Sequence, residues 1–325
     1  MTPSMTPARD MAADTTPEPP ACPAPRSPSY APSSSVPAGA CDCHAHIFGP
    51  PGRYPYVPAR RYTPASAGLD DYCRMLTALG IKRAVLVQPT IYVGNDAAID
   101  ATAALAQRGV AARAIVRLDA SADASADAAA IAKLHTAGAR GVRCHLRDPS
   151  HLGANELAEI ELLAARIAPF GWHLQLHLHG DALPALATWL RGLPVEVVLD
   201  HFARVRVAAG ANDPGYRTLL QLVRDGACWI KLSAPYRFDD PAPPYPSFTA
   251  LASMLVDAAP DRLLWGSDWP HSSFDGEMPD DAQLLDALAS WVPDADARRR
   301  ILVDNPARLY GFDGPPLHLP ELPHA

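Results

Sequence analysis

Four stretches of the chain end in side chains that can bind a metal ion or transfer a proton. They are His44-Ala-His46, Gln-Leu-His177-Leu-His179, Leu-Asp200-His201 and Gly-Ser-Asp268-Trp-Pro-His271. Imidazole and carboxylate groups are common ligands of catalytic zinc, and they are also common general acids and bases. A single His-x-His motif is weak evidence, because such histidines are often core or surface residues. Burying several such groups without partners would be costly, so their recurrence indicates one shared site.

The four stretches need a scaffold that brings their ends together, and the chain has a pattern of this kind. Short apolar runs alternate with segments of helical periodicity. The predicted strands are Cys43–Phe48, Arg83–Gln88, Ala112–Leu118, Gly141–Cys144, His173–His177, Val195–Asp200, Trp229–Leu232 and Leu263–Gly266. The predicted helices are Asp70–Leu79, Ala97–Arg108, Ala126–Thr136, Glu156–Ile167, Leu183–Leu190, Tyr216–Arg224, Phe248–Ala258, Ala282–Trp291 and a last one near Ala297–Val303. Strands that alternate with helices pair in parallel through right-handed crossovers.

Eight strand–helix units over about 270 residues match the usual size of a closed (β/α)₈ barrel. An open doubly wound sheet loses support, because no Gly-x-Gly-x-x-Gly follows an early strand. Active sites of such barrels lie at the carboxyl ends of the strands. His44 and His46 alternate along one strand and therefore point the same way, into the barrel. We predict an α/β protein with a single TIM-barrel domain over residues 41–312.

The composition limits the kind of partner and the compartment. The 325-residue chain has a formal net charge of −7 and no run of Lys or Arg that stands out, which argues against nucleic acid as a main partner. Its six cysteines are scattered, so no disulfide framework is expected. No apolar run approaches the ~20 residues of a membrane helix, and the first residues lack the apolar stretch of a secretory signal. We expect a cytoplasmic protein that does not bind membranes, and the sequence leaves open whether it forms a homo-oligomer.

The two ends of the chain differ from its middle. Residues 1–40 are rich in Pro, Ala, Ser and Thr and have little to bury, so they are predicted to be a disordered leader. Residues 313–325 contain a Pro-rich segment and are predicted to form an irregular tail.

Several motifs between Cys41 and Phe312 match one enzyme family. They are Asp-Cys-His44-Ala-His46-Ile-Phe-Gly-Pro, Val-Leu-Val-Gln88-Pro-Thr90, Gly-Val-Arg143, Asp200-His201-Phe-Ala-Arg204, Trp-Gly-Ser-Asp268-Trp-Pro-His271 and Asn305-Pro-Ala-Arg-Leu-Tyr310. On these residues the chain resembles the amidohydrolase superfamily, in the branch named amidohydrolase 2. The branch members that open carboxylated lactones, of pyrone-dicarboxylate or muconolactone type, are favoured by three further segments. These are Tyr54-Pro-Tyr-Val-Pro, Arg61-Tyr-Thr-Pro64 and Ile-Tyr92-Val-Gly-Asn95-Asp96.

The resemblance implies a hydrolase that opens a lactone ring by attack of water. It gives Asp268 the role of general base on that water, and it gives His201 the role of polarising the scissile carbonyl. The arginines expected to bind the anionic groups of a small substrate are Arg143, Arg147, Arg204 and Arg237. Arginine suits this role because its planar fork pairs with a carboxylate through two hydrogen bonds. Further residues expected to contact the substrate, on loops after the second and seventh strands, are Thr90, Tyr92 and Tyr236.

The histidine at the end of the fifth strand bears on a metal ion. A lactonase of this branch that works without metal carries a tyrosine at the position of His177, whereas the metal-binding members of the superfamily carry a histidine. The resemblance therefore implies one divalent metal ion, Zn²⁺ by its donor types. Its expected ligands are His44, His46, His177 and Asp268. The alternative of no metal stays open, and a shift of two residues in the fifth strand would put His179 in place of His177.

Other functions are compatible with the same residues. A metal-dependent non-oxidative decarboxylase of the same branch shares the histidines and the final aspartate. A sugar-lactone hydrolase or isomerase would keep the fold and differ in the pocket arginines. A non-catalytic barrel would be expected to have lost at least one polar strand end, and the chain retains all of them.

Overall fold

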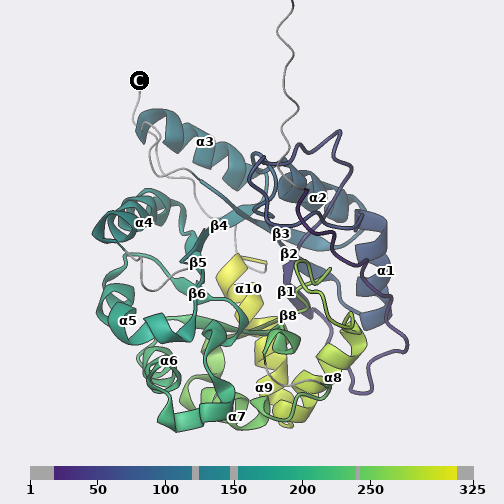
Figure 1. Ribbon diagram of the computed structural model, residues 1–325, viewed down its shortest axis with the longest axis vertical. Helices are drawn as coiled ribbons and strands as arrows, with labels where there is room; N and C mark the ends of the chain where they lie inside the picture. Colours follow the sequence, from purple (N-terminus) through teal and green to yellow (C-terminus); the bar gives the residue numbers. More distant parts are fainter. Residues whose placement is uncertain (1–17, 119–123, 147–152, 239–241, 313–325) are drawn as a thin grey trace, which may run out of the picture.

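Eight parallel strands form the centre of the molecule (Figure 1). The computed structural model describes residues 18–118, 124–146, 153–238 and 242–312. The strands are β1 Cys41–Ala45, β2 Arg83–Val87, β3 Ala111–Val116, β4 Ala139–His145, β5 His173–His177, β6 Val197–Leu199, β7 Trp229–Ser233 and β8 Leu263–Gly266. They are hydrogen-bonded in the order of the chain, each parallel to the next. This order confirms the predicted (β/α)₈ barrel.

A ring of helices surrounds the strands, as Figure 1 shows. The helices are α1 Leu69–Leu79, α2 Asp96–Gln107, α3 Ala124–Thr136, α4 Ala154–Ile167, α5 Leu183–Gly192, α6 Pro214–Arg224, α7 Phe248–Ala258, α8 Asp281–Trp291, α9 Ala295–Arg299 and α10 Asn305–Tyr310. In α1 the buried residues Tyr72, Met75, Leu76 and Leu79 have the spacing of one helical face, which packs on the barrel. None of the helices in the described ranges is long and apolar enough to cross a membrane.

The barrel closes between β1 and β8 at residues of the predicted site. The amide of His46 donates to the Trp269 carbonyl at 2.7 Å, and the amide of Asp268 donates to the His44 carbonyl at 2.8 Å. Gly266 permits this close approach, because a Cβ atom there would lie 2.7 Å from the Cβ of His44. The backbone itself therefore fixes Asp268 beside His44.

The end of the barrel at which the strands begin is filled by apolar side chains. There Cys43 belongs to a buried cluster that includes Tyr310 of α10. The Arg113 guanidinium donates from Nε to the Tyr310 carbonyl at 3.1 Å, and Figure 1 shows α10 at the centre of the ring of strands. The helix predicted near Ala297–Val303 is divided in the structure into α9, a π-helical turn at Arg300–Asp304, and α10. With this end covered, the opposite end is left for a site.

Residues 18–40 precede β1 and contain no helix. They are nevertheless attached to the rest of the protein. The amide of Cys22 donates to the Thr63 carbonyl at 2.8 Å, and the Ser29 hydroxyl donates to the Asp280 carboxylate at 2.6 Å. The polar groups of this segment thus find partners on the barrel, and the leader over residues 1–40 stays a prediction. Residues 1–17 and 313–325, which make up the rest of the predicted leader and tail, lie outside the described ranges.

Candidate active site

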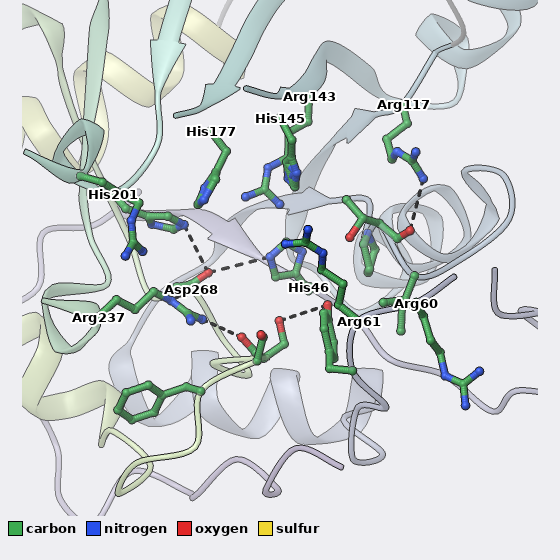
Figure 2. A pocket seen from close by; sticks show the side chains of 18 of the residues that line it. His46, Arg60, Arg61, Arg117, Arg143, His145, His177, His201, Arg237 and Asp268 are labelled. Carbon is green, nitrogen blue, oxygen red and sulfur yellow. Dashed lines mark hydrogen bonds and ion pairs between the residues drawn. The ribbon is translucent and has the colours of Figure 1, made fainter. Parts of the chain in front are cut away.

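A cavity of about 1080 Å³ opens at the carboxyl ends of the strands (Figure 2). Every strand contributes a residue at or just beyond its end to the wall. In strand order these include His46, Thr90, Arg117, Arg143, His177, His201, Tyr236 and Asp268. This is the end of a TIM barrel at which active sites lie, so the cavity is the candidate active site.

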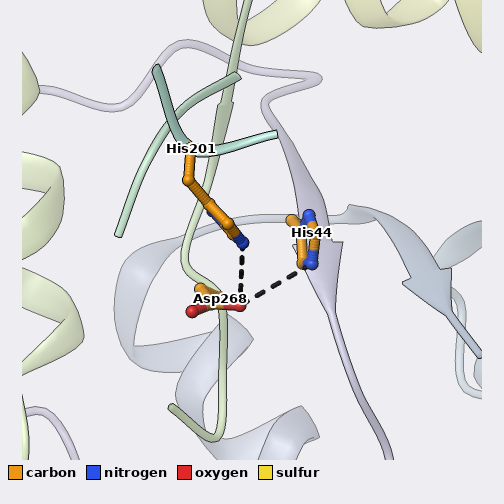
Figure 3. A group of neighbouring side chains, drawn as sticks. All are labelled: His44, His201 and Asp268. Carbon is orange, nitrogen blue, oxygen red and sulfur yellow. Dashed lines mark ion pairs between the residues drawn. The ribbon is translucent and has the colours of Figure 1, made fainter. Parts of the chain in front are cut away.

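Asp268 lies among three histidines in this cavity. Its Oδ1 atom is 3.6 Å from Nε2 of His44, and it is 3.8 Å from Nε2 of both His46 and His201. Figure 3 shows the His44 and His201 rings directed at this oxygen. All four side chains are buried. Groups that are far apart in the sequence thus meet around one carboxylate oxygen.

The histidines of β1 are oriented by contacts at their other ring nitrogen. The Nδ1 atom of His46 is 2.8 Å from the Val87 carbonyl oxygen, which can only accept a hydrogen bond. Nδ1 therefore carries the ring hydrogen, and Nε2 has an unprotonated lone pair. The Nδ1 atom of His44 lies 3.2 Å from Oδ1 of Asp200. In the described part of the chain, Nε2 of His44 is buried without a hydrogen-bond partner. His46 therefore presents a lone pair to the space beside Asp268, whereas Nδ1 of His44 contacts both the Asp200 carboxylate and, at 3.2 Å, the ammonium group of Lys231.

The lone pair on Nε2 of His46 and the carboxylate oxygen of Asp268, 3.8 Å apart, repel one another unless a cation lies between them. A tetrahedral zinc ion with bonds of about 2.1 Å holds its ligand atoms about 3.4 Å apart. That value is close to the separations of 3.6 and 3.8 Å found around Asp268. The group of His44, His201 and Asp268 is therefore one that could hold a metal ion.

An unusual turn after β6 directs His201 and Arg204 into the cavity. The four residues from His201 to Arg204 all have φ angles between 48° and 52°. Left-handed backbone costs L-amino acids about 1–2 kcal/mol per residue, and it persists where the surroundings impose it. Phe202 within the turn is fully buried and packs on Phe248, with ring centres 4.6 Å apart. This packing holds the turn in the strained form that positions His201.

The second carboxylate oxygen of Asp268 is held by the loop after β7. The Tyr236 hydroxyl donates to Oδ2 at 2.6 Å, and Nε of Arg237 donates to the same atom at 2.9 Å. Behind Tyr236, Nδ1 of His271 is 3.0 Å from the hydroxyl, and its Nε2 is 3.4 Å from Oδ1 of Asp281. These contacts fix the plane of the carboxylate, so that Oδ1 faces the histidines.

A second set of charged groups lies inside the barrel next to His44. Lys231 and Asp200 are fully buried, with Nζ 3.5 Å from Oδ1. Lys231 also donates to Oε1 of Gln175 at 2.7 Å, and it lies 3.2 Å from Nδ1 of His44. The Arg143 guanidinium approaches Oδ2 of Asp200 through Nε and Nη2, each at 3.1 Å. Lys231 and Gln175 are not among the predicted site residues, although a lysine within the apolar strand β7 is a signal that could have identified one of them.

The surroundings decide which of these groups are charged. Burial lowers the pKa of His44 to about 4, and it lowers the pKa of both His46 and His177 to about 3. Burial alone would raise the pKa of Asp268, but the charged Arg237 guanidinium beside it holds this pKa well below its usual range. At neutral pH the site therefore combines neutral imidazoles with an ionised carboxylate, which is the state in which these groups bind metal ions.

Most of the predicted substrate-contacting residues lie in the cavity wall. These are Thr90, Arg143, Arg204, Tyr236 and Arg237. Tyr92 does not line the cavity. Its side chain is buried, its hydroxyl donates to the Gly49 carbonyl at 3.2 Å, and its ring stacks on Tyr56. Arg147 lies outside the described residues.

His177 and His179 both line the cavity, and His177 is the more buried of the two. The ring centre of His177 is 5.6 Å from that of His201. Its possible ligand atoms group with those of Asp200 and His201, whereas the group around Asp268 contains His44 and His201. The assignment of His177 as a metal ligand stays a prediction.

Residues 41–312 match the family model described as amidohydrolase. The chain is 37% identical over 295 residues to 4-sulfomuconolactone hydrolase of Rhizobium radiobacter. This match covers 90% of this chain and 96% of that protein. It is 36% identical over 291 residues to 2-pyrone-4,6-dicarboxylate hydrolase of Comamonas testosteroni. This match covers 86% of this chain and 92% of the relative.

The fold is also similar to that of solved structures. One is a probable 2-pyrone-4,6-dicarboxylic acid hydrolase from Acinetobacter baumannii with citric acid bound. It is 25% identical, with a TM-score of 0.71, and the match covers 84% of this chain and 100% of that chain.

Proposed function

Since this chain belongs to the amidohydrolase family, we propose that it hydrolyses the ester bond of a lactone that carries carboxylate groups. The relatives are named for lactones with anionic substituents, a sulfomuconolactone and a pyrone dicarboxylate. The observation that carries the proposal is the ionised Asp268, whose Oδ1 atom lies within 3.8 Å of three imidazole nitrogens at the base of an arginine-lined cavity.

In the proposed reaction, Asp268 removes a proton from the attacking water. Its Oδ1 atom is available for this, because Tyr236 and Arg237 occupy Oδ2. Water adds to the carbonyl carbon, the ring C–O bond breaks, and the proton passes from Asp268 to the departing alkoxide. The product is one open chain with a hydroxyl and a carboxylic acid, and the acid ionises to a carboxylate and releases one proton to the solvent.

His201 stabilises the oxyanion that forms on the carbonyl oxygen. Its Nδ1 atom is 2.8 Å from the Ser233 hydroxyl, which can donate to it and so leave the ring hydrogen on Nε2. Nε2 faces the space in front of Asp268, 3.8 Å from Oδ1. Stabilising the developing charge in this way is usually the largest single contribution to catalysis.

We propose His44, His46, His177 and Asp268 as the ligands of one divalent ion, Zn²⁺ by its donor types. When bound, such an ion lowers the pKa of its water to about 7 and so supplies hydroxide at neutral pH. We assign the ligand role to His177 and not to His201, because Nδ1 of His177 is buried without a hydrogen-bond partner among the described residues. The corresponding atom of His201 is held by Ser233.

Metal content tests this ligand set without an activity assay. Protein purified without chelator is expected to hold about one equivalent of divalent metal per chain by mass spectrometry of the elements. His46→Ala and His177→Ala are expected to lose most of it, because each removes one ligand. His179→Ala is the matched control and is expected to keep it, as is His201→Ala. Loss of metal from His179→Ala with retention in His177→Ala would transfer the role to His179.

The function itself is tested with a panel of lactones. Metal-loaded protein is expected to open pyrone carboxylates or muconolactones, with one acid equivalent released per ring by pH-stat titration. Carbon dioxide is measured in the same reactions. Release of carbon dioxide without ring opening would assign a decarboxylase instead, and no turnover across the panel would contradict the proposal.

Replacing Tyr236 with phenylalanine is expected to lower kcat about tenfold, because a hydrogen bond to a charged group contributes about 1.5–3 kcal/mol and Arg237 remains in place. Steady-state kinetics measure the effect, and KM is expected to change little. Tyr62→Phe is the matched control, since the Tyr62 hydroxyl borders the same cavity but contacts Oγ of Ser272 at 3.5 Å. An equal fall in both variants would contradict the role of Tyr236 as a clamp on Asp268.

A further inference from the structure

The cavity carries more positive charge than its own carboxylates can neutralise. Among the described residues that line it are six arginines and two aspartates, Asp268 and Asp275. The arginines are Arg60, Arg61, Arg117, Arg143, Arg204 and Arg237. Cations grouped in a partly enclosed space repel one another, so their retention indicates an anionic ligand.

Half of these arginines are already paired within the protein. Arg143 is paired with Asp200 at 3.1 Å, and Arg237 with Asp268 at 2.9 Å. Arg60 lies 3.4 Å from Oε1 of Glu18, and its guanidinium lies over the Tyr56 ring at 5.0 Å. Arg143 and Arg237 were expected to bind the substrate. In the structure their guanidinium groups already pair with protein carboxylates.

The other three have no carboxylate partner in the described part of the chain. Nε of Arg204 is buried without a hydrogen bond, and its guanidinium lies over Phe238 at 5.7 Å. Among the described residues, the Arg117 guanidinium makes one long contact, 3.5 Å from Nη1 to the Thr90 carbonyl oxygen. Figure 2 shows Arg61 extending from the loop after β1 towards the centre of the cavity, whereas Arg60 points away from it.

These three arginines come from segments on two sides of the cavity mouth. Arg61 lies in the loop between β1 and α1, and Arg117 follows β3. Arg204 follows β6, which is three strands away from both β1 and β3 in the closed ring. Asp268 and its histidines lie between the two sides, because they stand at the base of the cavity.

We propose that Arg61 and Arg117 form a binding subsite for a second anionic group of the substrate, across the scissile ester from Arg204. This inference rests on the proposed lactone hydrolysis, which it makes more specific. The inference concerns the residues that bind the second anionic group, since lactones with anionic substituents are already those for which the relatives are named. Each group then meets a guanidinium with which it can form paired hydrogen bonds.

Binding of simple sulfonates tests the subsite without turnover. Isothermal titration calorimetry compares benzene-1,3-disulfonate with benzenesulfonate, because sulfonates bind metal ions weakly. The wild-type protein is expected to bind the disulfonate at least about tenfold more tightly. Arg61→Gln and Arg117→Gln are each expected to lower disulfonate affinity about tenfold and to leave monosulfonate affinity unchanged.

Arg60→Gln is the matched control, since it removes the neighbouring charge of the same loop and is expected to alter neither affinity. Arg61→Lys keeps the charge without the fork and is expected to recover part of the disulfonate binding. Equal losses for both ligands, or the same loss in Arg60→Gln, would overturn the subsite.

The kinetic test separates this inference from the proposed function. On a lactone with two anionic groups, Arg61→Gln is expected to raise KM about tenfold with kcat nearly unchanged, because the contact is the same in the ground and transition states. On the monomethyl ester of that lactone, KM is expected to be the same in variant and wild type. If the wild type opens both lactones equally well, the subsite is wrong and the hydrolase proposal stands. If it opens neither, the hydrolase proposal fails, and the sulfonate titration alone decides the subsite.

Discussion

An Asp268→Asn variant is expected to hydrolyse its lactone about 10³-fold more slowly than the wild type, within the range of about 10²–10⁴ that a general base contributes. The amide has the shape of the carboxylate, so it can keep the hydrogen bond from the Tyr236 hydroxyl to Oδ2. It cannot accept a proton from water, and it carries no charge to face the three imidazoles. The loss is expected in kcat, because the proton moves only in the transition state.

The control for this variant is a second aspartate of the same cavity. Asp275 lines the wall but is exposed, and it contacts none of the site histidines. Asp275→Asn is therefore expected to keep kcat within about twofold of the wild type, as a surface change should. Single-turnover measurements and metal content are compared for both variants. Undiminished turnover by Asp268→Asn, with metal and fold intact, would exclude Asp268 as the base.

The position of Asp268 illustrates what the sequence could predict. The alternation of apolar runs with helical segments defined eight strands, and the rule that barrel sites lie at strand ends then selected His46, His201 and Asp268. Nε2 of His46 and Nε2 of His201 each lie 3.8 Å from Oδ1 of Asp268. Periodicity and chain order were sufficient because they depend only on local composition.

The local backbone of the site could not be predicted in this way. Strict alternation along β1 would turn Cys43 and His44 to opposite faces. In the structure Cys43 belongs to the interior cluster, and His44 contacts Lys231 inside the barrel. The pairing of β1 with β2 is irregular between Asp42 and Ala45, which accounts for the change. The left-handed turn after β6 could not be predicted from the sequence either, because the packing of residues distant in the chain imposes it.

The partners of charged side chains were the least predictable feature. Arg143 was expected to bind substrate because it stands at a strand end. Its orientation depends on Asp200, which is 57 residues further along the chain. Lys231 depends in turn on Gln175 of β5 and on Asp200, which directly follows β6. Contacts of this kind form only when the barrel closes, so no local sequence pattern predicts them.

This buried network has a large effect on stability. Burial alone would raise the pKa of Asp200, but His44, Lys231 and Arg143 hold it well below its usual range, so the carboxylate is charged. Replacing Asp200 with asparagine leaves Lys231 and Arg143 in the barrel without their counter-ion. Removing one partner of a buried ion pair costs about 3–5 kcal/mol. We therefore expect Asp200→Asn to lower the free energy of unfolding by about that amount, measured by denaturant titration.

The control for this loss is an exposed pair with the same chemistry. Asp225 lies 2.7 Å from Nη2 of Arg191 at the surface, and Asp225→Asn is expected to cost less than about 1 kcal/mol. Adding Lys231→Met to Asp200→Asn removes one of the two stranded cations, so the double variant is expected to be more stable than Asp200→Asn alone by at least about 1 kcal/mol. If the second change instead adds a further independent loss, Lys231 is not neutralised by Asp200. The cation would then have to be stabilised by Gln175 and His44, and the barrel interior would be held together by hydrogen bonds more than by opposite charge.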